Sequence, residues 1–301
     1  MTSVSILDFA QAEVIAVIGL LRAYVDEFND YTDPACDFFG MQGLVGPVEA
    51  WHRLQCKWED ALDCCGLSHF HSTDLQAREG EFRGWTNYQS ERLMSLLINI
   101  VRENMGEFHL LGSAVFMSSY KFLPQYRSCH LKNPYFLCAM SAMSDATRVS
   151  HYHFGDTPVE FVFDQKSKHQ QWINLAYDDV LLTKYGHLCA AKSMANHRLV
   201  SPVQVADLVA YEAGKYIQAR MRRSDALEPE FTDLRWPIQR MSPLFWGSDT
   251  TLYNWHALML VTDFWNNYRN YCRFNGIATE ETHEQRKRRI QEIRRSHEQE
   301  V

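Results

Sequence analysis

The chain has 301 residues, of which 46% are hydrophobic and 22% charged, and its formal net charge is −7 at pH 7. This is the composition of a globular protein with one large core or two small ones. Proteins that coat nucleic acid without specificity are usually basic, so any nucleic-acid contact has to come from a local basic strip.

The cysteines and the apolar segments indicate in which cellular compartment the protein is expected. The eight cysteines include no Cys-x-x-Cys pair, which argues against a zinc ribbon and favours reduced, mostly buried thiols in a cytoplasmic protein. The apolar run Val14–Leu21 follows Asp8 and Glu13 rather than a basic segment. It is much shorter than the ~20 residues that cross a bilayer, so neither a membrane span nor a signal peptide is expected.

An opening β-hairpin is predicted after a short extension at 1–19. The first strand covers 20–25, a polar turn 29–37, and a Gly-rich second strand, open to a β-bulge, 38–45. Pro47 begins a helix that stops by Gly66. The segment His69–Thr73 is predicted to be a third short strand, which ends at Asp74.

Strands and helices then alternate. Pro134 and Pro202 stand at first helical positions, and 158–163 is apolar on both faces, as a buried central strand is. The pattern predicts an α/β sheet covered by helices on both faces. The remaining predicted elements are a helix capped by Asn87 or Ser90, a strand at 109–117, a helix at 134–152, a strand at 158–163, a helix at 169–182, a strand at 188–191 and a helix at 202–221.

The amino-acid composition changes after Met221. Residues 222–248 are rich in Pro, Asp and Arg and indicate an irregular lid or linker, 252–271 predict a strongly aromatic helix, and 280–300 predict a charged helix. We therefore expect a core at 1–221 and an accessory, largely helical region at 222–301. The aromatic helix is a candidate face for a homodimer.

Acidic residues occur where strands or helices should meet a cleft. Asp26-Glu27, Asp74 and Asp164 follow apolar runs, and Asp207 lies in an apolar helix. Carboxylates gathered in one place repel each other unless a divalent cation lies between them. Taken singly, an Asp at a strand end is also a common turn former or helix cap.

Spacing separates the roles of these residues. Asp26 and Glu27 face opposite ways along a strand, so Asp26 is the favoured ligand and Glu27 a second ligand or a base. Asp74 and His71 act together only if a turn lies between them. Further candidates for substrate binding are Lys166 and Lys168, placed to hold a phosphate, and Gln204, placed to reach a backbone group or a ligand.

Four of these segments resemble the family catalogued as domain of unknown function 3800. They are Tyr-Val-Asp-Glu at the first strand, Phe-His-Ser-Thr-Asp at the third, Phe-Val-Phe-Asp at a later strand, and Val-Gln-Val-Ala-Asp-Leu-Val-Ala-Tyr-Glu at 203–212. The order and rough spacing also match, over about residues 20–220. This chain has Phe28-Asn29 where that family usually has Ser-Gly.

The resemblance implies a ribonuclease-H-like fold with an acidic metal site at the centre of a mixed sheet. It implies a two-metal site formed by Asp26, Glu27, Asp164 and Asp207, with Asp74 close by. The cofactor would be Mg²⁺ or Mn²⁺, which prefer oxygen ligands.

The resulting hypothesis is a metal-dependent nuclease that hydrolyses phosphodiester bonds in DNA or RNA. Two alternatives stay open: a binding protein that retains the fold without the chemistry, and a metal-dependent phosphohydrolase of small substrates. Dinucleotide, P-loop and α/β-hydrolase motifs are absent from the sequence.

Overall fold

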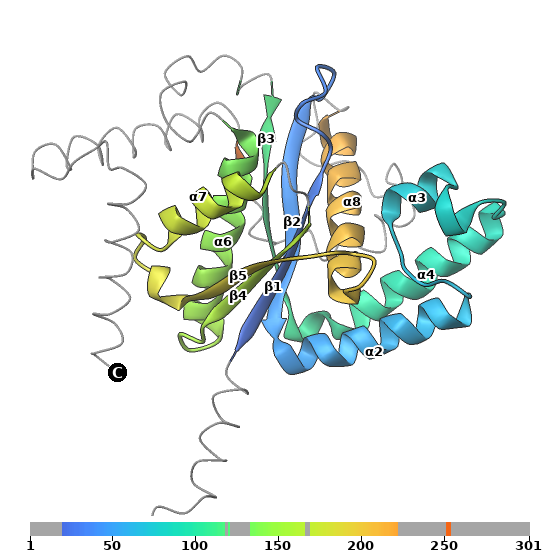
Figure 1. Cartoon of the computed structure of the whole chain (residues 1–301), viewed down its shortest axis with the longest axis horizontal. Helices are drawn as coiled ribbons and strands as arrows, with labels where there is room; N and C mark the ends of the chain where they lie inside the picture. The colour runs from blue at the N-terminus through green and yellow to red at the C-terminus, as the bar shows by residue number, and fades with distance from the viewer. Residues whose placement is uncertain (1–19, 118–119, 121–132, 166–168, 222–250, 254–301) are drawn as a thin grey trace, which may run out of the picture.

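The structure, a computed structural model, describes residues 20–117, 120, 133–165, 169–221 and 251–253. These residues form a mixed sheet with helices on both faces (Figure 1). Within them, no helix is both long and apolar enough to cross a membrane. The predicted extension at 1–19 and charged C-terminal helix lie outside the described residues, as does the predicted aromatic helix apart from Leu252 and Tyr253, which belong to a short strand instead.

The sheet is built around a central strand, β1, which has an antiparallel neighbour on one side and a parallel neighbour on the other. The predicted hairpin is confirmed, and its register runs without a bulge from Leu21↔Pro47 to Phe28↔Gly40. The order is β5-β4-β1-β2-β3-β6. The strands are β1 (Leu21–Phe28), β2 (Phe38–Pro47), β3 (His109–Phe116), β4 (Val159–Asp164), β5 (Cys189–Ala195) and β6 (Thr251–Tyr253).

Helices cover the two faces of the sheet in separate groups (Figure 1). On one face α8 contacts β1, β2 and β4, and α2 packs against α4 and α8. On the other face α6 contacts β1 to β4 and packs against α7. The helices are α2 (Val48–Cys64), α3 (Ser72–Ala77), α4 (Asn87–Asn104), α6 (Pro134–His153), α7 (Gln170–Val180) and α8 (Ser201–Met221), with 3₁₀ turns η1 (Gly80–Phe82), η2 (Met105–Glu107) and η6 (Gly186–Leu188).

Alternation along β1 divides the core. Tyr24 and Phe28 belong to the cluster under α2, α4 and α8, whereas Leu21, Ala23 and Val25 belong to the cluster under α6 and α7. Successive strand residues point to opposite faces, so even-numbered β1 residues face α8 and odd-numbered ones face α6. This parity decides where each acidic residue of β1 points.

Two helix starts show how local sequence sets the elements. Asn133 accepts a hydrogen bond from the Tyr135 N–H at 2.8 Å, with Pro134 as the first helical residue. The start of α4 differs from the prediction, because its cap is Thr86 rather than Asn87 or Ser90. Thr86 and Gln89 form a reciprocal capping box, which needs a Gln or Glu three residues after the cap.

The predicted strand at 69–73 is wrong. His71 is extended, but the chain turns there into the helix α3, which begins at Ser72. No local side chain caps α3. Instead the Asp207 carboxylate, from α8, accepts a hydrogen bond from the Ser72 N–H at 2.6 Å. A partner distant in sequence therefore satisfies the helix start, and no local pattern signals it.

Close strand packing at Gly43 supplies a test of the sheet. A Cβ built on Gly43 would lie 2.0 Å from the Tyr24 carbonyl oxygen, in the backbone of the paired strand. We expect Gly43→Ala to lower the free energy of unfolding by about 1–3 kcal/mol or more, because β1 and β2 must separate.

Urea denaturation followed by circular dichroism measures the change. Gly106→Ala is the matched control, since nothing lies within 4 Å of a Cβ there, and its effect should stay within about 1 kcal/mol. Equal effects of the two substitutions would contradict the assigned β1–β2 packing.

Candidate functional site

Two of the predicted acidic residues lie on adjacent parallel strands. Asp26 has the parity of Tyr24 and Phe28 on β1, and Asp164 that of Val162 on β4, so both face α8. The parallel register pairs Val25 with Phe163, immediately before the two aspartates. Asp26 is 4% and Asp164 5% exposed. The sheet thus holds two buried carboxylates next to each other on one face.

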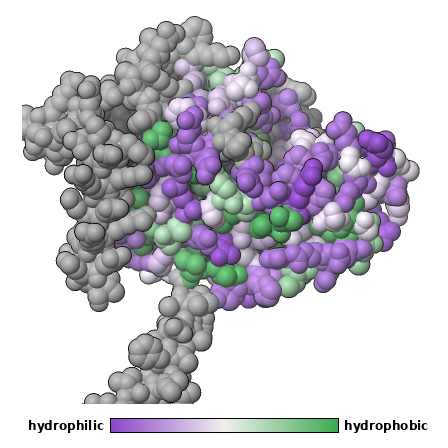
Figure 2. Space-filling model, in the orientation of Figure 1, coloured by the Kyte–Doolittle hydropathy of each residue, from purple (hydrophilic) through white to green (hydrophobic). Residues whose placement is uncertain are grey.

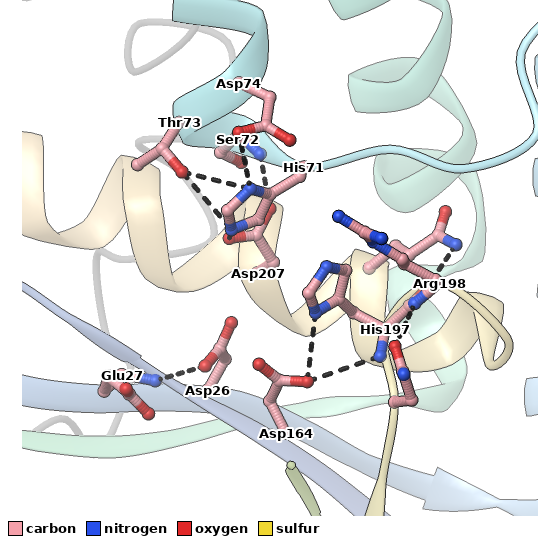
Figure 3. A network of polar contacts seen from close by, with 12 residues as sticks. Asp26, Glu27, His71, Ser72, Thr73, Asp74, Asp164, His197, Arg198 and Asp207 are labelled. Carbon is pink, nitrogen blue, oxygen red and sulfur yellow. Dashed lines mark hydrogen bonds and ion pairs between the residues drawn. The ribbon is translucent and has the colours of Figure 1, made fainter. Parts of the chain in front are cut away.

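Asp207 joins them from the helix above. It lies in the first half of α8, which packs over β1 and β4, and it is 7% exposed. Figure 3 shows its side chain on the same side of the sheet as those of Asp26 and Asp164. Three carboxylates from segments far apart in the sequence therefore lie on the same face of the sheet.

A pair of stacked histidines connects this group. The His71 and His197 rings are 4.9 Å apart between centroids and 12° from parallel. His197 Nδ1 lies 3.2 Å from Asp164 Oδ1. His71 Nδ1 lies 3.2 Å from Asp74 Oδ1, and its Nε2 lies 4.0 Å from Asp207 Oδ1. Each imidazole thus faces carboxylates, and the stack joins the α3 side of the site to the β4 side (Figure 3).

Sequence reasoning missed the histidine pair. His71 was considered only with Asp74, and His197 lies in a loop with no periodic pattern to single it out. The turn that joint action of His71 and Asp74 requires is present, because α3 begins between them. Asp74 lies at the edge of the site, with 30% of its side chain exposed.

A buried amide lies beside Asp26. Gln42 is the β2 partner of Asp26 and is fully buried. Its own β3 partner is Gly112, where a Cβ would lie 2.6 Å from Gln42 Oε1 and where φ is +151°. Only glycine leaves room for the amide at this position. Gln42 is a second polar group of the site that the sequence pattern did not single out.

Glu27 is separated from the other acidic residues. It points to the opposite face of β1, where its Oε2 accepts a hydrogen bond from the Tyr135 hydroxyl at 3.3 Å (Figure 3). Burial, followed by the nearby Glu27 and Asp26 carboxylates, raises the pKa of Tyr135 well above its ordinary value. The Tyr135 hydroxyl therefore stays a proton donor. The geometry does not support Glu27 as a ligand in the same metal site.

Gln204 has structural partners. Its Oε1 accepts hydrogen bonds from the Trp58 indole and the Phe70 N–H, both at 3.0 Å, and its Nε2 donates to the His197 carbonyl at 2.7 Å. These bonds link α8 to the segments that carry His71 and His197. In this structure Gln204 positions the site, and substrate contact stays only a prediction. Lys166 and Lys168 lie outside the described residues.

The ligand atoms are of the type that a hard divalent cation prefers, since Asp26, Asp164 and Asp207 supply carboxylate oxygens. Each carboxylate already accepts a hydrogen bond: Asp26 from the Glu27 N–H, Asp164 from His197, and Asp207 from the Ser72 N–H. In the described part of the chain, no three Asp, Glu, His or Cys side chains are close enough to hold a metal ion. Binding a cation would therefore require these side chains to move closer together.

Comparisons with known proteins leave the function open. No known protein-family model matches the sequence, and no curated protein is similar to it. An assignment therefore rests on the geometry of the site and on the short motifs that resemble domain of unknown function 3800.

The Gln204 network leads to a stability prediction. Gln204→Leu would leave the Trp58 indole and the Phe70 amide without their acceptor, and both residues are fully buried. We expect the free energy of unfolding to fall by about 2–6 kcal/mol, since each of the two orphaned buried donors costs about 1–3 kcal/mol.

Denaturation and amide hydrogen exchange at Phe70 measure the effect. Gln171→Leu, at an exposed position of α7, is the matched control and should change stability by less than about 0.5 kcal/mol. Unchanged Phe70 exchange in Gln204→Leu would show that this network does not hold the segment.

Proposed function

We propose that this protein is a metal-dependent nuclease that hydrolyses phosphodiester bonds in DNA or RNA. The observation that carries the proposal is the burial of Asp26, Asp164 and Asp207 on one side of the central strands. Three buried carboxylates on one face of a sheet are costly unless hydrogen bonds or cations compensate them.

Asp26, Asp164 and Asp207 would hold Mg²⁺ or Mn²⁺. When bound, such ions stabilise the attacking and leaving oxygens of a phosphodiester. The protein's contribution would be to anchor the segments that carry the ligands, whose side chains would close around the ion. Asp26 and Asp164 are attached to paired strands, and Asp207 is tied to Ser72 through its second oxygen.

The architecture supports the proposal at the level of the fold class. The resemblance to the family of unknown function 3800 implies a ribonuclease-H-like fold with an acidic site at the centre of a mixed sheet. The mixed sheet here has β1 at its middle, and Asp26 is on β1. Asp74, at the exposed edge beside His71, is placed to orient a water molecule or a substrate group.

Loss of one carboxylate tests the activity. We expect the wild type to cut single- or double-stranded DNA or RNA in Mn²⁺. Asp164→Asn should reduce cleavage on the order of a hundredfold or more, because a ligand of the cation is lost. Asparagine keeps the oxygen that accepts from the His197 N–H at 3.3 Å, so the fold should persist. Gel analysis of labelled polymers measures the rate.

Asp63→Asn is the matched control, since Asp63 is exposed on α2, and its cleavage should equal that of the wild type. Release of free phosphate from nucleotides without shortening of polymers would favour the small-substrate alternative. Absence of both activities would overturn the proposal.

Metal binding is tested separately by thermal unfolding. Mn²⁺ at a hundred times its dissociation constant should stabilise the wild type by about 2.7 kcal/mol, and this gain should shrink in Asp26→Asn. Without metal, Asp26→Asn should melt at or above the wild-type temperature, because one like charge is removed. Stabilisation by Mn²⁺ that is identical in the two proteins would place the metal elsewhere.

A further inference from the structure

The loop between β5 and α8 is fixed to the site at its centre. The His197 N–H donates to Asp164 Oδ1 at 3.3 Å, and the His197 carbonyl accepts from Gln204 Nε2 at 2.7 Å. Asn196 Oδ1 accepts from the Arg198 N–H at 2.9 Å, and the Leu199 N–H donates to the Asn196 carbonyl at 2.9 Å. The backbone that carries Arg198 and Leu199 is therefore held next to Asp164 through His197 and is fixed locally by Asn196.

Two of the three exposed residues of this loop, Arg198 and Leu199, have side chains suited to binding. Arg198 is exposed, and Leu199 is 83% exposed, the highest value among the exposed large hydrophobic residues described. Among the described residues, no carboxylate lies within ion-pairing distance of the Arg198 guanidinium, although Asp164 pairs with His197 next to it. In the view of Figure 3 the Arg198 side chain extends in the direction of His71.

The positive charge of Arg198 suits it to binding a phosphate. A chain of net charge −7 with an acidic site repels a polyanion, so a phosphodiester substrate needs a cation at the rim of the site. A guanidinium binds phosphate with two parallel hydrogen bonds. Figure 2 shows a largely hydrophilic face on which hydrophobic residues form small separate areas. Leu199 is one of four exposed large hydrophobic residues in the described part of the chain, which suits one local apolar contact rather than a broad protein interface.

We propose that Arg198 binds a backbone phosphate of a single-stranded nucleic acid, and that Leu199 packs against the adjoining nucleoside. The inference rests on the proposed function, and it names the substrate class and two residues that bind it. The pinned loop would hold one nucleotide of the strand at the edge of the carboxylate site. A substrate that has a phosphate but no nucleoside would contact Arg198 and not Leu199.

Binding without cleavage is the appropriate measurement. Fluorescence anisotropy of a fluorescein-labelled 12-residue single strand, DNA and RNA in turn, is recorded with the full chain in EDTA and again in Ca²⁺. We expect Arg198→Ala to weaken binding about tenfold. The slope of log K against log salt should fall by about 0.7, the value for one phosphate contact on a single strand. Arg198→Lys should recover part of the affinity.

Leu199→Ser should weaken binding about fivefold, because a partly buried leucine contact is lost, and should leave the salt slope unchanged. Arg102→Ala is the matched control. Arg102 is exposed in the last turn of α4, which leads through η2 to His109 at the end of the sheet away from Asp26. Its affinity should stay within about twofold of the wild type.

The outcomes separate this inference from the proposed activity. The inference would be overturned if the wild type bound neither the single-stranded DNA nor the single-stranded RNA, or if Arg198→Ala bound as tightly as the wild type. This holds even if the protein cuts nucleic acid by another route. Weakened binding by Arg198→Ala in a protein that never cuts would sustain the inference and overturn the proposed hydrolysis.

Discussion

Burial of like charges on one face of the sheet is the constraint on which the rest of this structure depends. Asp26, Asp164 and Asp207 are each less than a tenth exposed, and such groups are stable only where hydrogen bonds or cations compensate them. Backbone N–H groups from Ser72 and His197 and the side chains of His71 and His197 supply that compensation within the chain. The polar network is thus a condition for folding as well as a candidate for catalysis.

The same network explains how three distant segments keep their positions. Gln204 and Asp207 lie three residues apart on α8, so they share one side of the helix. They bind the segment from Phe70 to Ser72 and the loop at His197. A single helix face therefore orders both histidines, and the stacked rings are a consequence of this attachment. A site built this way on packed elements holds its geometry better than one on free loops.

The buried carboxylates and the exposed residues of the 196–200 loop lie next to each other. Inside, the side chains are acidic and buried, which suits a cation. Outside, the pinned loop carries an arginine and an exposed leucine, which suits a strand with phosphates and nucleosides. His197 connects the carboxylates to this loop. Its backbone carbonyl accepts a hydrogen bond from Gln204, and its ring lies 3.2 Å from Asp164 Oδ1.

Much of the fold follows from local pattern. The hairpin of β1 and β2, the proline that begins α6, the proline at the second position of α8, and the apolar run of β4 each appear in the sequence. Asp26 and Asp164 were predicted as candidates because each follows an apolar strand, and for Asp26 the alternation along the strand also separated it from Glu27. The Thr86 cap was missed although its signature, a threonine followed three residues later by a glutamine, is visible in the sequence.

What the sequence determined by itself was therefore the elements, their alternation and the acidic candidates, since these depend on neighbours within a few residues. Only the tertiary structure decided that residues 72–77 form a helix and that His71 stacks on His197. It also decided that Glu27 faces away, toward Tyr135. These features rest on contacts between groups more than a hundred residues apart, such as Asp207 with Ser72. No local propensity carries that information, because the energy of such a contact exists only once the chain has closed on itself.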